Sequence, residues 1–110
     1  MERALRLDGA NGFAAFQLGE TYYYLGRHAE AVTSLERALA LTPGGHAMLM
    51  AHLFLAAAYA KLGRHEDAES ERAVVEQVWP LVDSRVVAVQ IGTGMMQEHL
   101  LDGLKKAGFR

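Results

Sequence analysis

The sequence contains no cysteine, only two prolines and almost no net charge. Without cysteine the chain forms neither disulfides nor thiolate metal sites, and this composition fits a cytoplasmic location. The formal net charge is −2 at pH 7, so the charge balance provides no basic surface for a nucleic-acid backbone. No apolar run approaches the roughly 20 residues that span a bilayer. These absences predict a protein that binds neither nucleic acid nor a membrane.

The length and composition fit a single folded domain over residues 1–110. A chain of 110 residues can enclose one continuous core but not two. Apolar residues make up 51% of the chain and charged residues 22%, which is the balance of a globular protein and not of a disordered one.

The two prolines lie 37 residues apart, at Pro43 and Pro80, and the segments before them repeat. The segment YYYLGRHAEA (residues 22–31) recurs as YAKLGRHEDA (residues 59–68). A second pair, ERALRLD (residues 2–8) and ERALALT (residues 36–42), recurs at an offset of 34. Two aligned blocks with matching glycine and proline positions indicate an internal repeat.

Each repeated unit has the pattern of two helices joined by a tight turn. Apolar residues recur at intervals of three and four on both sides of Gly26, which supplies the backbone freedom to end a helix. The second helix is expected to stop before Pro43, because proline is costly inside a helix and restricts the residue before it.

These residues resemble the tetratricopeptide repeat family. The first unit matches the family signature at Leu18, Gly19, Tyr22, Gly26, Ala31, Leu35, Ala38 and Pro43. The second unit matches at Leu55, Ala56, Tyr59, Gly63, Ala68 and Pro80. Arg72 departs from the pattern, because a large apolar residue is usual there, and Val75 replaces a small residue.

The resemblance covers about residues 1–80 and implies an all-α fold. The expected fold is a row of helix-turn-helix hairpins in a right-handed superhelix, with a half-repeat helix at 1–9, one repeat at 11–43 and a second at 46–80. The half-repeat would lack its partner helix and expose Ala4, Leu5 and Leu7. This uncapped edge predicts self-association, with a homodimer as one outcome. A start in mid-repeat is expected either for a piece of a longer array or for a naturally truncated product that begins at Met1.

Residues 81–110 do not continue the repeat. Segment 84–91 is rich in β-branched residues, but a helical domain offers no sheet, so a short helix over 84–90 is favoured. After a glycine break at 92–94, residues 95–107 are expected to form an amphipathic capping helix with Met96, Leu100, Leu101 and Leu104 on one face. The run HLLDGLKKAG (residues 99–108) also resembles the tails of some multidomain bacterial signalling proteins, including cyclase-like ones. That similarity implies a part of a larger bacterial regulatory protein.

The histidines do not predict a metal site. His28 and His65 occupy equivalent positions in the two units, which favours a shared role in the turn. His46 and His52 are six residues apart, whereas ligands on one helical face are three or four apart. The carboxylates next to His99 are interpreted as solvated helix charges.

The chain is not expected to be an enzyme, and no cofactor is expected. It has no cysteine nucleophile, and none of its serines lies in a glycine elbow with a plausible base. The segment GTG (residues 92–94) lacks the spacing and the lysine of a phosphate-binding loop, so a hinge is the favoured interpretation.

In this family, the first helices of successive hairpins line a concave groove. The residues expected there are Phe13, Phe16, Gln17, Glu20, Tyr23 and Tyr24 from the first unit, and Met50, Leu53, Ala57 and Lys61 from the second. Tyr22 is assigned to packing between hairpins, which leaves Tyr23 and Tyr24 as candidates for recognition. The alternative is that these two tyrosines contact the N-terminal helix or the C-terminal tail.

The groove residues bear on the kind of ligand. Family members that clamp a terminal carboxylate place lysine and asparagine along the groove, but the corresponding positions here hold Phe16, Glu20, Leu53 and Ala57. This lining favours an apolar or amphipathic helix. The sequence thus predicts a protein–protein interaction or scaffold module with a protein or peptide partner. The alternative is a structural dimerisation or spacer element whose groove is filled by its own tail.

Overall fold

The computed structural model describes residues 8–41, 46–91 and 94–110, and all regular secondary structure within them is helical. The elements are α2 (Asp8–Tyr24), α3 (His28–Leu41), α4 (His46–Lys61), α5 (His65–Val78), α6 (Ser84–Ile91) and α7 (Met95–Lys106). The β-branched segment 84–91 is therefore a helix, as favoured from the sequence. The predicted half-repeat helix and its exposed edge lie outside the described residues, except that Asp8 and Gly9 belong to α2. The predicted hinge residues 92 and 93 also lie outside them.

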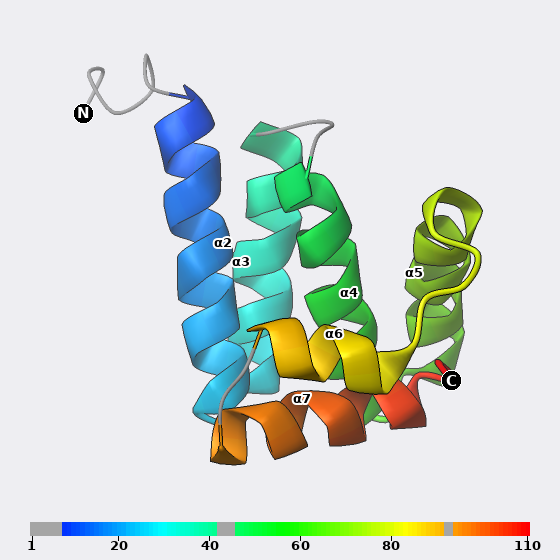
Figure 1. Ribbon diagram of the computed structural model, residues 1–110. Helices are drawn as coiled ribbons and strands as arrows, with labels where there is room; N and C mark the ends of the chain where they lie inside the picture. The colour runs from blue at the N-terminus through cyan, green and yellow to red at the C-terminus, as the bar shows by residue number, and fades with distance from the viewer. Residues whose placement is uncertain (1–7, 42–45, 92–93) are drawn as a thin grey trace.

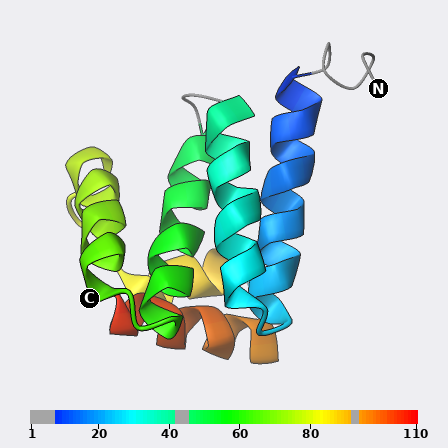
Figure 2. The ribbon, with the colours of Figure 1, turned by 180° about the vertical axis from the view of Figure 1, so that it is seen from behind.

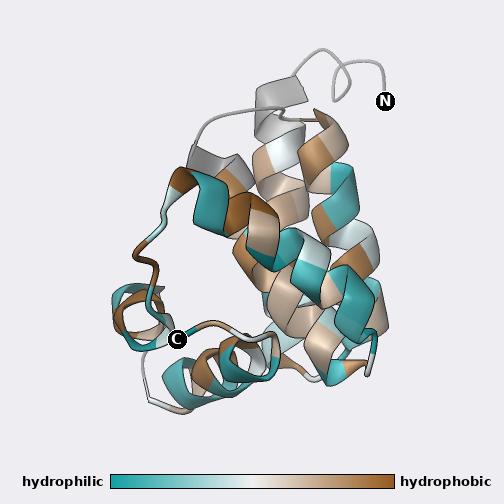
Figure 3. Ribbon diagram, turned by 90° about the vertical axis from the view of Figure 1, so that its right-hand side faces the viewer, coloured by the Kyte–Doolittle hydropathy of each residue, from teal (hydrophilic) through white to brown (hydrophobic). Residues whose placement is uncertain are grey.

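The first four helices form two antiparallel hairpins that stand side by side, α2 with α3 and α4 with α5 (Figures 1 and 2). This arrangement confirms the all-α fold of tandem hairpins. The shorter helices α6 and α7 run across the hairpins near the end where the α2–α3 and α4–α5 turns lie (Figure 1). Seen from the α5 side, this pair lies to one side of the hairpins and does not lengthen the row beyond α5 (Figure 3). None of the described helices is long and apolar enough to cross a membrane.

Helix α4 is the centre of the core. Every residue from Ala51 to Ala60 is buried, because α4 contacts α2, α3, α5 and α7. A helix that is apolar on all sides is stable only when it is surrounded in this way. The buried side chain of His52 in α4 lies within hydrogen-bonding distance of the Glu71 carboxylate of α5 through its Nδ1 atom. Phe54 packs edge-on against Phe16, Tyr23 and Tyr24 of α2, which joins the first helices of the two hairpins.

The turn within each hairpin has the same geometry. Gly26 and Gly63 have φ angles of 82° and 79°, in the left-handed region that favours glycine. In the first turn, the N–H of Arg27 donates to the carbonyl of Tyr22 at 2.9 Å, and the N–H of Gly26 donates to that of Tyr23 at 3.1 Å. This pair of bonds is the Schellman motif, which satisfies the last carbonyls of a helix. The prediction that Gly26 ends the first helix is confirmed.

We expect Gly26→Val to lower the free energy of unfolding by about 2 kcal/mol, because a β-branched residue is strained at positive φ. No atom lies within 4 Å of the position that a Cβ would occupy, so the cost comes from the backbone alone. Gly26→Asn is the matched control and should lose less, since asparagine tolerates this conformation. Thermal unfolding monitored by circular dichroism measures both. Equal melting temperatures for the valine variant and the unmodified chain would contradict the turn assignment.

Candidate functional site

Helix α7 lies across the C-terminal ends of α2 and α4, on the face predicted to be the concave groove. Leu100 and Leu104 of α7 are fully buried. Between them, Gly103 lies directly against the Tyr23 hydroxyl, and a Cβ at this position would lie 2.8 Å from the Cβ of Ala57. No Cβ fits at that distance, so glycine allows α7 to approach α4 this closely.

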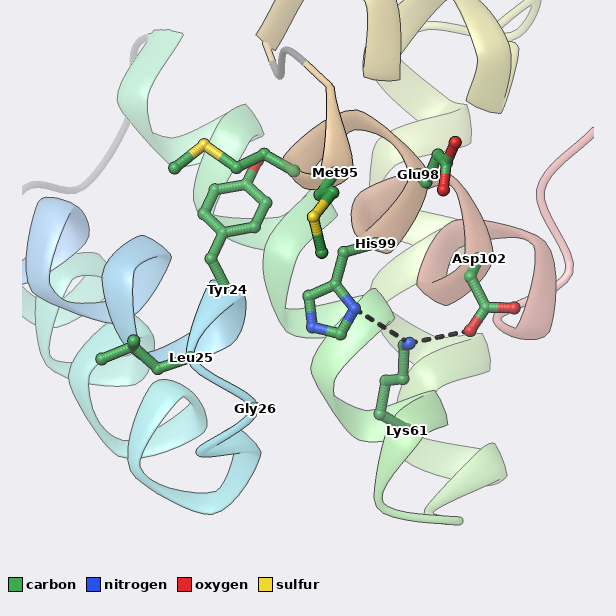
Figure 4. Close-up of a pocket in the computed structure, with 9 residues that line it drawn as sticks. Tyr24, Leu25, Gly26, Lys61, Met95, Glu98, His99 and Asp102 are labelled. Atoms are coloured by element: carbon green, nitrogen blue, oxygen red, sulfur yellow. Dashed lines mark hydrogen bonds and ion pairs between the residues drawn. The ribbon is translucent and has the colours of Figure 1, made fainter.

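A polar network joins the middle of α7 to α2 and α4, and Figure 4 shows its contacts between Lys61, His99 and Asp102. The Tyr23 hydroxyl donates to the backbone carbonyl of His99 at 2.7 Å, and His99 Nε2 lies 2.9 Å from the carbonyl of Tyr23. Lys61 Nζ lies 3.3 Å from His99 Nδ1 and 2.7 Å from Asp102 Oδ2. A neutral His99 with its proton on Nε2 satisfies both contacts, donating to Tyr23 and accepting from Lys61. Both carboxylates next to His99 are exposed, as the sequence interpretation of solvated helix charges requires, but Asp102 is in addition paired with Lys61.

The network is electrostatically favourable for its neutral tyrosine and its charged aspartate. Burial, with Asp102 as the next contribution, raises the pKa of Tyr23 far above its usual value, so the hydroxyl remains a donor. The hydrogen bond from Lys61 lowers the pKa of Asp102, which favours its ionised form. The contact between Lys61 and Asp102 is thus a charge-assisted one across the α4–α7 boundary.

His28, the first residue of α3, lies next to two members of this network, Tyr23 and His99. Its ring centroid is 5.3 Å from that of Tyr23 and 5.6 Å from that of His99. The Nδ1 atom of His28 is buried and has no hydrogen-bond partner among the described residues. His65 begins α5 at the equivalent position, so the two histidines share their place after the turn, but His65 is exposed. The surroundings differ because only His28 lies beside His99 of α7.

The stability of the chain should fall between pH 7.5 and pH 5, partly through His28. Burial, followed by the nearby His99 and Lys61, lowers the pKa of His28 below the usual histidine value of 6.5. The unfolded chain therefore binds this proton more readily, so the stabilising contribution of neutral His28 is present above pH 6.5 and is lost as the pH falls through the folded-state pKa.

Urea unfolding at both pH values tests this prediction with matched variants. His28→Gln should show a smaller pH-dependent loss of unfolding free energy than the unmodified chain. His65→Gln, at the equivalent exposed position, should retain the full loss. Identical pH dependence in the two variants would show that His28 makes no special contribution.

Arg72 of α5 holds the other end of α7. Its Nε donates to the carbonyl of Ala107 at 3.0 Å, and its Nη1 forms an ion pair with Glu76 at 3.1 Å. An arginine at a helix C-terminus satisfies an open carbonyl and interacts favourably with the helix dipole. Arg72, which departs from the repeat pattern, thus bonds to a residue outside the repeats, Ala107. Val75, the other departure, is fully buried.

The end of the chain joins α6 to α7. Ser84, which begins α6, is fully buried and donates through Oγ to the backbone oxygen of Arg110 at 2.5 Å. Phe109 is 4% exposed and belongs to the same core cluster as Val87 of α6. The two helices therefore pack as a pair. Among the described helices, α6 contacts only α7.

The predicted groove residues fall into three groups. Those in direct contact with α7 or fully buried are Tyr23, Leu53, Ala57 and Lys61. Those that are partly buried are Phe16, Glu20, Tyr24 and Met50. Phe13 and Gln17, nearer the start of α2, are exposed. The structure therefore brings the C-terminal part of the predicted set together under α7 and leaves its N-terminal part uncovered.

Tyr23 is not a free recognition residue in this conformation, because its side chain is 0% exposed. Tyr23 instead contacts the C-terminal tail through His99, which is the alternative stated in the sequence analysis. Tyr22 is partly buried, and the guanidinium of Arg27 lies 5.0 Å from its ring centroid. The Tyr24 hydroxyl is buried, and no residue in the described part of the chain forms a hydrogen bond with it. Burial, with Glu20 as the next contribution, raises the pKa of Tyr24, so this hydroxyl is also neutral.

A pocket of about 590 Å³ opens beside the polar network (Figure 4). It lies between the turn after α2, the end of α4 and the N-terminal half of α7. Its residues are Tyr24, Leu25, Gly26, Lys61, Met95, Met96, Glu98, His99 and Asp102. Met95 and Met96 are 85% and 49% exposed, so Met96 does not join the buried face predicted for α7. The first turn of this helix is loosely packed.

Sequence reasoning missed three residues that fix α7, namely His99, Gly103 and Arg72. Two of them carried a signal. Arg72 broke the repeat pattern, and Gly103 is a glycine inside an otherwise good helix, which often marks a close packing contact. Within the described parts of the chain, no group of three or more histidine, aspartate or glutamate side chains is arranged to hold a metal ion.

Comparison with protein-family models matches residues 10–71 to a model described as "Tetratricopeptide repeat". The match spans more than half of the chain and includes α3 and α4 in full, with most of α2 and part of α5. It does not include α6 or α7. Comparisons with curated proteins and with solved structures gave no match.

Proposed function

Because this chain belongs to the tetratricopeptide repeat family, we propose that it binds a protein or peptide as a helix in the concave groove formed by α2 and α4. Repeats of this family generally mediate protein–protein interaction or scaffolding. The observation that supports groove binding is α7 itself. An amphipathic helix with two fully buried leucines, Leu100 and Leu104, already lies across this face, as in the helix-in-groove mode of recognition.

Part of the groove is open to a ligand. The α6–α7 pair crosses only one end of the hairpins and does not cover the N-terminal half of α2 (Figure 1). Phe13 is 54% exposed there, and Gln17 lies one turn further along the same helix. Phe16 and Met50 are partly buried and pack against the core. An apolar strip with a polar neighbour suits the apolar side of a helix or an extended peptide.

A second function is supported by the same helix. If α7 remains in place, the chain is a structural spacer or dimerisation element whose groove is filled by its own tail. The complete burial of Leu100 and Leu104 favours this alternative. The further expectations of a homodimer, a cytoplasmic location and a place in a larger bacterial regulatory protein remain predictions from the sequence. The repeat boundaries at 11–43 and 46–80 also remain predictions.

Selection of displayed peptides of about 16 residues, long enough for roughly four helical turns, tests the proposal on the full chain. Selected peptides should bind with an affinity that falls at least tenfold in Phe13→Ser, which is about 1.4 kcal/mol of binding free energy. Leu18→Ser is the matched control, because Leu18 is a similarly exposed apolar residue of α2 outside the predicted groove. Equal losses in both variants, or a library that yields no binder, would favour the spacer function instead.

A further inference from the structure

The contacts of α7 define what the covered end of the groove accepts. The residues of α7 that contact α2 or α4, or that are fully buried, follow the pattern His-Leu-x-Asp-Gly-Leu over residues 99–104. Leu100 and Leu104 are one turn apart and fully buried. A helix that fills this site therefore needs two large apolar residues at a spacing of four.

The glycine of the pattern is required by the floor of the groove. Gly103 lies over the Tyr23 hydroxyl and the small residue Ala57, where a Cβ would have no room. Any larger residue at this position of a bound helix would force the helix away from α4. The floor thus selects for glycine between the two leucines.

The charged position of the pattern is set by Lys61. This side chain is 14% exposed and reaches Asp102 at 2.7 Å and His99 Nδ1 at 3.3 Å. A bound helix without an acceptor here would leave a largely buried ammonium group unpaired, which is strongly unfavourable. Lys61 therefore selects an acidic residue next to the glycine.

Several features indicate that α7 can leave the groove. The hydroxyl of Tyr24 and Nδ1 of His28 are buried beside it and find no hydrogen-bond partner within residues 8–41, 46–91 and 94–110. The pocket of about 590 Å³ separates its first turn from α2, and Met95 projects into solvent. Since α6 contacts only α7 among the described helices, release of α7 frees both helices together and uncovers the side of α4 that α7 contacts.

We propose that α7 occupies the groove in place of a partner and that the partner is a helix of another protein with the pattern Leu-x-Asp-Gly-Leu, which displaces α7. This inference rests on the proposed function, since it names the ligand class of the same groove. The chain is then self-inhibited. A partner competes with α7 for Tyr23, Ala57 and Lys61, and its binding exposes the α6–α7 pair.

The test uses a dye-labelled peptide with the sequence of residues 94–110 as the probe, and the full chain as the receptor. In the unmodified chain, α7 should exclude the probe. In Gly103→Leu, the tail no longer fits its own groove, so the probe should bind at least tenfold more tightly by fluorescence anisotropy. A probe that itself carries Gly103→Leu should not bind. Circular dichroism establishes that the receptor variant keeps its helical hairpins.

A charge exchange provides a second receptor that does not depend on the glycine. The Lys61→Glu chain should bind a probe with Asp102→Lys more tightly than the unmodified probe. A probe with Glu98→Lys is the matched control, because Glu98 is an exposed acidic residue of the same helix that points away from Lys61 (Figure 4). This control should gain no affinity for the Lys61→Glu chain.

The inference would be overturned if the folded Gly103→Leu and Lys61→Glu receptors bound none of their probes. It would also be overturned if the Gly103→Leu receptor bound probes with glycine and with leucine at position 103 equally. A concentration-dependent dimer of the unmodified chain that dissociates in Gly103→Leu would also overturn it, because the occupant would then be a second copy. The proposed function is judged separately by the displayed peptides. Peptides that depend on Phe13 but lack the pattern would retain the groove function and reject the α7-like ligand.

Discussion

Tyr23→Ala should lower the free energy of unfolding by about 4 kcal/mol, the range found when a large buried aromatic side chain is truncated. Tyr23 is fully buried and packs against the rings of Phe54 and His99. Its removal leaves a cavity between α2, α4 and α7 and takes away the hydroxyl that donates to the carbonyl of His99. Because small domains have only about 5–15 kcal/mol of stability, the variant should melt roughly 20 °C lower.

Two neighbouring tyrosines provide the controls for this result. Tyr24→Phe removes a buried hydroxyl that has no partner, so it should be neutral or slightly stabilising. Tyr22→Ala should lose clearly less than Tyr23→Ala, since Tyr22 is only partly buried. Urea denaturation of the three variants orders them directly. A Tyr23→Ala chain as stable as the unmodified one would mean that this tyrosine is exposed in solution and that α7 does not cover it.

Leu104→Ala should cost about 3 kcal/mol, and the loss should be concentrated in α7. Leu104 is fully buried in the C-terminal half of this helix, where truncation of leucine costs about 2–5 kcal/mol. The hairpins have their own core around α4, so they should remain folded when α7 is weakened. Stability is not uniform across a protein, and a helix held mainly along one face can open by itself.

Hydrogen exchange distinguishes opening of α7 from global unfolding. In Leu104→Ala, amides of α6 and α7 should lose protection, while those of α3 and α4 should retain most of theirs. Leu101→Ala is the matched control in the same helix, because Leu101 is only partly buried, and it should cost less than about 1 kcal/mol. Uniform loss of protection across all helices would show that α7 is an integral part of the core and cannot act as a displaceable occupant.

The sequence by itself determined the hairpins. Helix ends depend on local signals, such as the left-handed glycine at Gly26 and its copy at Gly63, and these appear directly in the repeat. The apolar run of α4 also predicts a helix that is surrounded by others. Local structure could be inferred because each signal acts within a few residues of its cause.

Only the tertiary structure decided what the repeated residues do. Tyr22, Tyr23 and Tyr24 are adjacent, but successive residues of a helix face directions about 100° apart. Tyr23 is the buried one because α7 packs on it, through His99, which lies 76 residues later in the chain. His28 and His65 follow the same local sequence and differ for the same reason, because His28 lies beside His99 of α7 and His65 is exposed. The contacts of Arg72, Gly103 and Lys61 join segments far apart in sequence, and no periodicity in a single sequence specifies such long-range pairs.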